Sequence, residues 1–255
     1  MENLKFDVIS PHIGQLTISQ PARRNALNAL MWAALPTVLK TAEESGIRVL
    51  IVTGDGEHFA SGADISEFET LYATPQSAKE ISDAIAAGFN ALASFPMPTI
   101  AKIRGACIGG GCGLALCCDL RFADTTSKFA ITPAKLGLVY PFSDVQRLIS
   151  IVGIAHARDI LFSARVIKAK QARKMGLINN LCKVDSLNSV VTAYAQRVSQ
   201  LSPQTIKVTK DMLRLHSAGQ AGETQETETM FLNGFSADDF REGYRAFLDK
   251  RPAQF

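Results

Sequence analysis

The feature that most constrains how this chain can fold is a run of three glycines, Gly109 to Gly111, inside the segment GACIGGGCGLALCCD (105–119). The preceding residues 98–104 are typical of a short strand, and residues 114–118 are typical of a buried helix. Between them the chain must turn sharply, and glycine adopts backbone conformations that are closed to other residues. A helix that begins directly after such a turn points unpaired N–H groups and the positive end of its dipole at whatever lies there. The segment therefore predicts either an anion or oxyanion site or a tight turn packed in the core.

Glycine spacing and composition exclude several classes of function. The phosphate-binding pattern G-x-x-x-x-G-K-[ST] is absent here, and Leu114 stands where the last glycine of G-x-G-x-x-G would be. With 255 residues, 47% of them hydrophobic and 20% charged, the chain is expected to form one globular domain or a domain with an appendage. A net charge of +3 and the lack of a dense basic run argue against nucleic acid as a partner.

The cysteines and the hydropathy pattern indicate a soluble protein of a reducing compartment. Three of the five cysteines, Cys112, Cys117 and Cys118, fall in one apolar segment without C-x-x-C pairing, so we expect small core residues and no metal site. The N-terminus MENLKFDVIS does not resemble a secretory signal, and no apolar run approaches the ~20 residues that span a bilayer. We therefore expect a cytoplasmic protein without a membrane partner.

Strand and helix patterns alternate over the first part of the chain. We expect strands at 4–9, 13–18 and 48–53, helices at 28–45 and 75–94, and further alternating segments at 99–103, 106–118 and 119–123. A second small-residue turn at 59–65 repeats the strand, loop and helix order of the glycine segment. From residue 143 the pattern is helical, with helices expected at 143–152, 154–162, 168–175, 186–201, 203–217, 223–234 and 238–249. The sequence thus predicts an α/β core at 1–195 and a helical region at 196–255.

Taken together, six ordered blocks resemble the crotonase, or enoyl-CoA hydratase/isomerase, superfamily over essentially the whole chain. They are PARRNALN (21–28), VLIVTGDGEHFASGADISEF (49–68), KIRGACIGGGCGLALCCDLRFA (102–123), KFAITPAKLGL (128–138), QRL (146–148) and EGYRAFLDKRPAQF (242–255). The resemblance implies a spiral core of repeated ββα units with a helical C-terminal trimerisation region. It further implies trimers or dimers of trimers that bind acyl-CoA thioesters, with coenzyme A as part of the substrate and no separate cofactor.

The resemblance also assigns residues to a binding site. The family holds the thioester carbonyl between two backbone N–H groups, which fall on Ala63 and on Gly110. Residues that match the family's coenzyme A contacts are Arg24, Ala26, Leu27, Ala60, Asp64, Ile65 and, on the C-terminal helix of the same or a neighbouring subunit, Phe247 and Lys250. Asp64 is expected in addition to hold the loop that presents Ala63.

The chain departs from the hydratases of this family at both acid/base positions. Gly113 stands where the first glutamate is expected, and the second position falls on Pro133 with Ala134 beside it. Because adding water across a double bond needs groups that deprotonate water and protonate carbon, ordinary hydration is not expected. Two other residues are candidates for proton transfer. Tyr140 is one, if it is not a packing tyrosine, and Asp144 is the other, if it does not merely cap a helix beginning near residue 145.

Three functions remain open from the sequence. One is a hydratase- or isomerase-like reaction that uses Tyr140, Asp144 or a bound water. A second is decarboxylation of a malonyl-type acyl-CoA, since the segment TPAKLGLVY (132–140) resembles the T-P-x-x-L-G-x-x-Y pattern of the methylmalonyl-CoA decarboxylase branch, although that branch carries histidine where this chain has Ala63. The third is an acyl-CoA-binding protein without catalysis.

Overall fold

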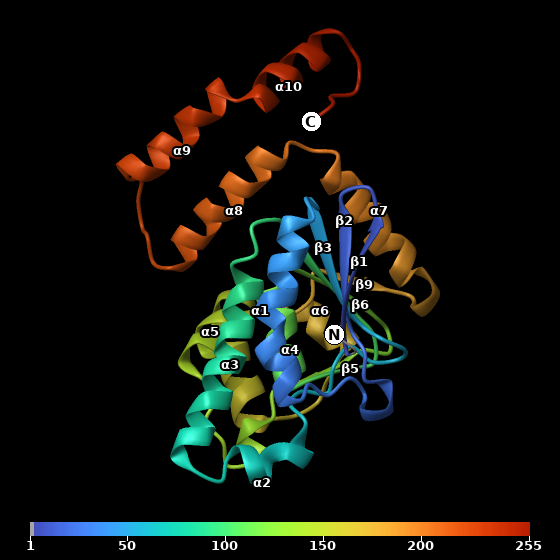
Figure 1. Cartoon of the computed structure of the whole chain (residues 1–255), viewed down its shortest axis with the longest axis vertical. Helices are drawn as coiled ribbons and strands as arrows, with labels where there is room; N and C mark the ends of the chain where they lie inside the picture. Colours follow the sequence, from blue (N-terminus) through green and yellow to red (C-terminus); the bar gives the residue numbers. More distant parts are fainter. Residues whose placement is uncertain (1–2) are drawn as a thin grey trace.

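A six-stranded sheet forms the centre of the computed structural model, which describes residues 3–255, and helices cover both of its faces (Figure 1). The strand order is β1 (Leu4–Ser10), β2 (Ile13–Ile18), β3 (Val49–Gly54), β4 (Thr99–Ile103), β6 (Leu120–Asp124) and β9 (Asn180–Cys182). The expected hairpin is confirmed, because β1 and β2 are antiparallel. The other neighbouring strands of this sheet are parallel, as expected for an α/β core.

Strand β3 separates two hydrophobic cores. Its side chains alternate between the faces of the sheet, so that Leu50 and Val52 enter one core while Val49 and Ile51 enter the other. Burial on both faces explains the unbroken apolar run in the sequence. The larger core is packed by helices α1 (Ala29–Glu44), α3 (Pro75–Ala93) and α4 (Gly110–Cys117), and the smaller one by α7 (Leu187–Ser199).

A second, three-stranded sheet positions the chain just before α4. It consists of β5 (Ala106–Ile108), β7 (Lys128–Ala130) and β8 (Ile167–Lys168), with β5 parallel and β8 antiparallel to β7. The N–H of Gly109 donates to the carbonyl of Ala130 (2.8 Å) and continues this pairing up to the glycine run. Strands of two or three residues carry no readable periodicity, and the sequence did not predict this sheet.

The helix boundaries follow their capping signals. Asn28 accepts a hydrogen bond from the N–H of Met31 and caps α1 as expected, and Ser202 caps α8 (Pro203–Ser217) in front of Pro203. Helix α5 (Phe142–Ser163) is interrupted at Gly153, where φ is +72°, so the two separate helices predicted there are confirmed. The remaining short elements are α2 (Phe68–Leu71), α6 (Ala169–Lys174) and the 3-10 helices Pro21–Arg23, Ile65–Glu67, Pro133–Lys135 and Val184–Ser186.

The last helices, α8 to α10, extend away from the sheet (Figure 1). Helix α8 is anchored by the buried Lys210, whose Nζ donates to the carboxylate of Asp119 (2.6 Å) and to the carbonyl of Met97 (2.9 Å). Helices α9 (Gln225–Ser236) and α10 (Asp238–Leu248) expose a series of aromatic side chains: Phe231, Phe235, Phe240, Tyr244 and Phe247. The division at 195/196 stays a prediction. Within residues 3–255 none of the helices has the length and apolar character needed to span a bilayer.

Candidate active site

The two small-residue turns lie side by side because backbone hydrogen bonds connect them through neighbouring segments. The N–H of Leu27 donates to the carbonyl of Gly62 (2.8 Å), and the N–H of Asp64 donates back to Leu27 (2.9 Å). On the other side of the same loop, the N–H of Ile108 donates to the carbonyl of Ala60 (2.9 Å). The loop that carries Ala63 is therefore held between the 21–28 segment and β5.

Glycine is required at three points of this arrangement. Gly62 has a φ of +101° and Gly109 has a φ of +54°, a region that side chains with a Cβ rarely adopt. At Gly111 the limit is space, because a Cβ built there would lie 2.4 Å from the carbonyl oxygen of Ala60. The glycine run thus allows α4 to begin in direct contact with the neighbouring loop.

The N–H groups of Ala63 and Gly110 meet at this contact. A Cβ built on Gly62 would lie 3.2 Å from the nitrogen of Gly110, and one built on Gly110 would lie 3.6 Å from the nitrogen of Ala63. Gly110 is the first residue of α4, so its N–H has no partner within the helix. In the part of the chain that the structure describes, neither N–H donates to another protein group. The structure therefore brings both predicted donors to one place and leaves them free to bind an acceptor.

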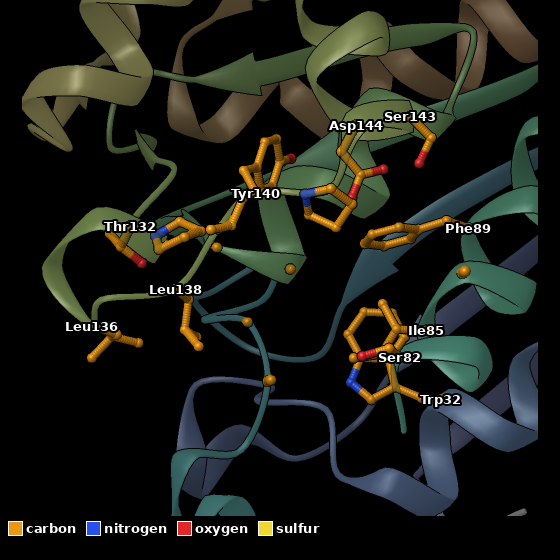
Figure 2. A pocket seen from close by; sticks show the side chains of 18 of the residues that line it. Trp32, Ser82, Ile85, Phe89, Thr132, Leu136, Leu138, Tyr140, Ser143 and Asp144 are labelled. Carbon is orange, nitrogen blue, oxygen red and sulfur yellow. The ribbon is translucent and has the colours of Figure 1, made fainter. Parts of the chain in front are cut away.

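These donors face a cavity of about 280 Å³ (Figure 2). Its walls come from the loop 61–65, from helices α1 to α3 and from the segment 132–147. Most of its lining is apolar, and the main contributors are Trp32, Phe68, Tyr72, Ile85, Phe89, Leu136, Leu138 and Val139. In residues 3–255 no three His, Cys, Asp or Glu side chains converge on a point where a metal ion could bind. An apolar cavity with a few convergent polar groups is typical of a small-molecule site.

A carboxylate held by an arginine forms the polar wall of the cavity. Asp144 pairs with Arg147 one helical turn further along α5, and the other guanidinium nitrogen of Arg147 donates to Asn90 on α3 (2.8 Å). Burial raises the pKa of Asp144 above its ordinary value, and the Arg147 charge opposes this shift. The suggestion that Asp144 caps its helix is wrong, because α5 begins at Phe142 with Pro141 as N-cap. Of the described residues that line the cavity, Asp144 alone carries a carboxylate.

Tyr140 lies beside this carboxylate, with its ring packed against the larger core. Its hydroxyl is buried and has no hydrogen-bond partner in the described chain. Burial raises the pKa of Tyr140 well above its ordinary value, and the nearby Cys112 and Asp144 act in the same direction. The hydroxyl is therefore held in its protonated form, in which it can donate.

Neither of the two positions that would carry glutamates holds a carboxylate. Gly113 is buried beneath Phe89, and a Cβ built there would lie 2.6 Å from the ring carbon Cζ. Pro133 lines the cavity, while Ala134 belongs to the same 3-10 helix but does not line it. The ring of Phe89 thus occupies the space into which a side chain from position 113 would extend.

The predicted coenzyme A residues of the first two blocks lie at the cavity or next to it. Ile65 lines the cavity and is largely exposed, and Asp64 accepts hydrogen bonds from Arg23 and Ser66 that hold the loop. Arg24 is exposed and its φ is +52°. The side chains of Ala26, Leu27 and Ala60 are buried, so these three residues can offer only backbone groups to a ligand.

The predicted C-terminal contacts are not brought to the cavity within one chain. Phe247 on α10 is 84% exposed, and neither it nor Lys250 lines the cavity. Figure 1 places α10 at the far end of the molecule from α2, which contributes to the cavity wall.

Sequence reasoning missed several residues that shape the site. Asn90 and Arg147 come from different helices, so no local pattern predicts their hydrogen bond. The pairing of Arg147 with Asp144 could have been predicted, because the two residues are three positions apart in one helix. Trp32 was noted, but its direction was unknown. The structural role of Asn25 was missed: it is fully buried and donates to the carbonyls of Asp55 (2.8 Å) and His58 (2.7 Å), holding the 21–28 segment in place.

Comparison with known proteins gives the family. The sequence model described as enoyl-CoA hydratase/isomerase matches residues 9–255. The 2,3-dehydroadipyl-CoA hydratase of Escherichia coli is 33% identical over 94% of this chain and 93% of its own length, and the crotonyl-CoA hydratase of Syntrophomonas wolfei is 31% identical over 94% and 93%.

Solved structures agree with the sequence comparison. A member of the enoyl-CoA hydratase/isomerase family from Hyphomonas neptunium has a TM-score of 0.96 at 42% identity, covering 99% of this chain and 97% of its own. A protein described as an enoyl-CoA hydratase/carnitine racemase, from Magnetospirillum magneticum, has a TM-score of 0.95 at 30% identity, covering 100% of this chain and 96% of its own. The expected spiral of ββα units with a helical C-terminal region is thereby confirmed. The chain belongs to the enoyl-CoA hydratase/isomerase family of enzymes, within the crotonase superfamily.

Proposed function

We propose that this enzyme binds an acyl-CoA thioester and stabilises its enolate with the N–H groups of Ala63 and Gly110. The thioester oxygen accepts both hydrogen bonds. When a bond at C2 breaks and its electron pair moves toward the carbonyl, negative charge develops on that oxygen. Donors fixed in advance stabilise this charge without reorganising, and removing one such donor typically costs about 100- to 1000-fold in rate.

One observation carries this proposal: two backbone N–H groups from separate segments meet at an apolar cavity and have no acceptor of their own. Unpaired backbone donors are rare in folded proteins unless water or a ligand pairs with them. The glycines of this region support the same conclusion, since they allow the two segments to approach each other closely.

Proton transfer is assigned to Asp144 and Tyr140. The raised pKa of Asp144 suits a group that must both accept and release a proton, and Arg147 fixes the direction of its carboxylate. The protonated hydroxyl of Tyr140 can donate a hydrogen bond to a group on the acyl chain or a proton to carbon. A single carboxylate in the cavity wall supports reactions in which one group transfers one proton, from C2 to C4 in isomerisation or onto C2 after decarboxylation, rather than the two-glutamate addition of water.

Decarboxylation of a malonyl-type acyl-CoA is the second candidate. Loss of CO₂ leaves the electron pair of the broken C–C bond on the enolate, so that only one proton must then be delivered to C2. The protonated and unpartnered Tyr140 hydroxyl favours this reaction, because it provides a donor without requiring a second acid/base group. Binding of acyl-CoA without turnover is the third candidate.

Coenzyme A is assigned to the rim formed by Arg24 and Ile65, with Phe247 and Lys250 supplied by a neighbouring subunit of a trimer or a dimer of trimers. Exposed aromatic side chains on α9 and α10 support association through these helices. Native mass spectrometry tests the trimer directly. We place the enzyme in the cytoplasm, since all five cysteines are free and buried.

The test compares crotonyl-CoA, a 3-enoyl-CoA and methylmalonyl-CoA, with products followed by mass spectrometry. We expect isomerisation or decarboxylation to exceed hydration, and Asp144→Asn or Tyr140→Phe to lower that activity while CoA thioesters still bind. Hydration of crotonyl-CoA at ordinary enzyme rates of about 1–1000 per second would contradict the assignment of one-proton chemistry. Binding of thioesters without turnover of any substrate would support the third candidate instead.

A further inference from the structure

A second, polar cavity of about 340 Å³ lies on the other face of the six-stranded sheet. Leu50 and Val52 of β3 point to the core beside the candidate active site, whereas Val49 and Ile51 point to α7 on the opposite side of the sheet (Figure 1). Thr53 continues the alternation of Val49 and Ile51 and lines the polar cavity. Of the described residues, none lines both cavities. The polar cavity is therefore separate from the candidate active site.

The polar cavity is built where the apolar face of the sheet ends. Thr17 on β2, Thr53 on β3 and Lys102 on β4 are register partners in a row across three parallel strands. The row lies near the carboxyl ends of these strands, which is where open α/β sheets commonly bind ligands. Asn188, in the first turn of α7, contacts Lys102 from the helix side. Polar groups thus replace the hydrophobic core at the point where α7 begins.

Lys102 is a partly buried cation with neutral partners. Its Nζ donates to the side-chain oxygens of Gln15 (3.2 Å) and Asn188 (3.1 Å), and within residues 3–255 it forms no ion pair with a carboxylate. Burial lowers the pKa of Lys102 from its ordinary value, and the charge of the nearby Arg104 lowers it further. An ammonium group has three N–H donors, so one donor of Lys102 is left for another acceptor.

Arg104 brings a second positive charge to the polar cavity. Its Nε lies 3.3 Å from the carboxylate of the buried Asp124, and in the described part of the chain its two terminal nitrogens have no acceptor. The lining includes one carboxylate, the exposed Asp55, which accepts a hydrogen bond from the hydroxyl of Ser19 (2.8 Å). An anion in the cavity would give Lys102 and Arg104 a common counter-ion and relieve their mutual repulsion.

We propose that the polar cavity binds the phosphate group of a small polar ligand through Nζ of Lys102 and the guanidinium of Arg104. A phosphate group carries about two negative charges at neutral pH, enough for both cations, and its oxygens point in several directions. A carboxylate carries one charge and two oxygens in one plane. The inference does not depend on acyl-CoA binding, because neither Arg24 nor the two oxyanion donors belong to this cavity.

Calorimetric titration at constant ionic strength tests the proposal with inorganic phosphate, glycerol 3-phosphate and acetate. We expect both phosphate ligands to bind with Kd values of about 1–10 mM and acetate to bind about 10-fold more weakly. The tighter of the two phosphate ligands identifies the source, a free phosphate ion or a phosphomonoester. Lys102→Gln should weaken both by about 10-fold or more, the range of a hydrogen bond to a charged group.

Two variants serve as matched controls. Lys5→Gln removes the same charge from an exposed position on β1 of the same sheet, outside the polar cavity, and should leave the affinity for phosphate unchanged. Arg24→Gln removes a charge from the rim that we assign to coenzyme A, and it should also leave the affinity unchanged.

Reductive methylation of lysines tests the site in the wild-type protein, without relying on a variant. Peptide mass spectrometry follows the rate at each lysine. At a phosphate concentration about tenfold above its Kd most sites are filled, so methylation of Lys102 should slow severalfold while Lys5 keeps its rate.

Four results would overturn the inference. They are the lack of saturable phosphate binding up to about 50 mM, an equal loss of affinity in Lys5→Gln and Lys102→Gln, acetate binding as tight as that of phosphate, and no protection of Lys102 from methylation. Loss of phosphate binding in Arg24→Gln with full affinity in Lys102→Gln would also overturn it, by placing the phosphate at the coenzyme A rim.

Discussion

Replacing Gly113 by alanine adds one methyl group at the point where Phe89 packs onto α4. The added Cβ would lie 2.6, 3.1 and 3.3 Å from three carbons of the Phe89 ring, closer than non-bonded carbons approach. The ring is 4% exposed and packs against Trp32, so moving it sacrifices an aromatic contact worth about 0.5–1.5 kcal/mol. Overpacking of this kind costs about 1–3 kcal/mol of unfolding free energy.

The higher helix propensity of alanine stabilises the variant and so opposes the cost of overpacking. A second glycine-to-alanine variant is needed to measure this gain by itself. Alanine is favoured over glycine inside a helix by about 1 kcal/mol. Gly234 in α9 supplies the matched control, because no atom lies within 4 Å of a Cβ built there. We expect Gly113→Ala to be about 1–3 kcal/mol less stable than Gly234→Ala in urea unfolding, and Phe89→Leu to relieve most of that difference in a double-mutant cycle.

The reasoning would be refuted if Gly113→Ala stabilised the protein as much as Gly234→Ala. That result would mean that Phe89 does not occupy the space above Gly113. The ring would then not be what keeps a larger side chain, such as glutamate, out of position 113. Additive effects of Gly113→Ala and Phe89→Leu would lead to the same conclusion.

Three further predictions concern two groups of the site and one buried arginine of the core. Tyr140→Phe should leave the unfolding free energy unchanged or raise it by up to about 1–3 kcal/mol while it lowers turnover, because it removes a buried hydroxyl without a partner; clear destabilisation in urea contradicts this. Burial raises the pKa of Asp144 above 3.8, so the folded state holds this proton more tightly than the unfolded state. The wild type should therefore lose stability relative to Asp144→Asn as pH rises from about 3.8 through the raised pKa, and a relative gain over this window refutes it. Arg121 is buried and donates to the carbonyls of Leu177 and Cys118 (2.8 Å each), so Arg121→Met should cost about 3 kcal/mol or more in thermal or urea unfolding; a loss below about 1 kcal/mol is inconsistent with this role.

Local signals explain which elements the sequence predicted correctly. The side chains of Asn28 and Ser202 can each cap a helix, and each residue stands directly before a helical pattern. Both helices begin where expected. Strand β3 was also predicted correctly. Its apolar run is unbroken because its side chains enter hydrophobic cores on both faces of the sheet. The convergence of the two small-residue turns was expected from the family resemblance, which places one oxyanion donor in each turn.

Contacts between distant segments explain what the sequence could not give. Arg147, Asn90 and Asp144 meet because α3 and α5 flank one cavity, and no local pattern encodes that approach. The direction of Trp32 depends on the packing of α1 against α3. The three-stranded sheet escaped prediction for a different reason, since its strands are too short to show alternation.

The central claim is that the N–H groups of Ala63 and Gly110 hold the thioester oxygen, and isotope-edited infrared spectroscopy measures this most directly. Butyryl-CoA labelled with ¹³C at the thioester carbonyl is bound to the wild-type protein, and its C=O stretch is compared with the stretch in free solution. Two donors on one oxygen polarise and weaken this bond, so the account predicts a shift of the band to lower wavenumber. A bound thioester whose carbonyl band stays at its solution position would contradict the account.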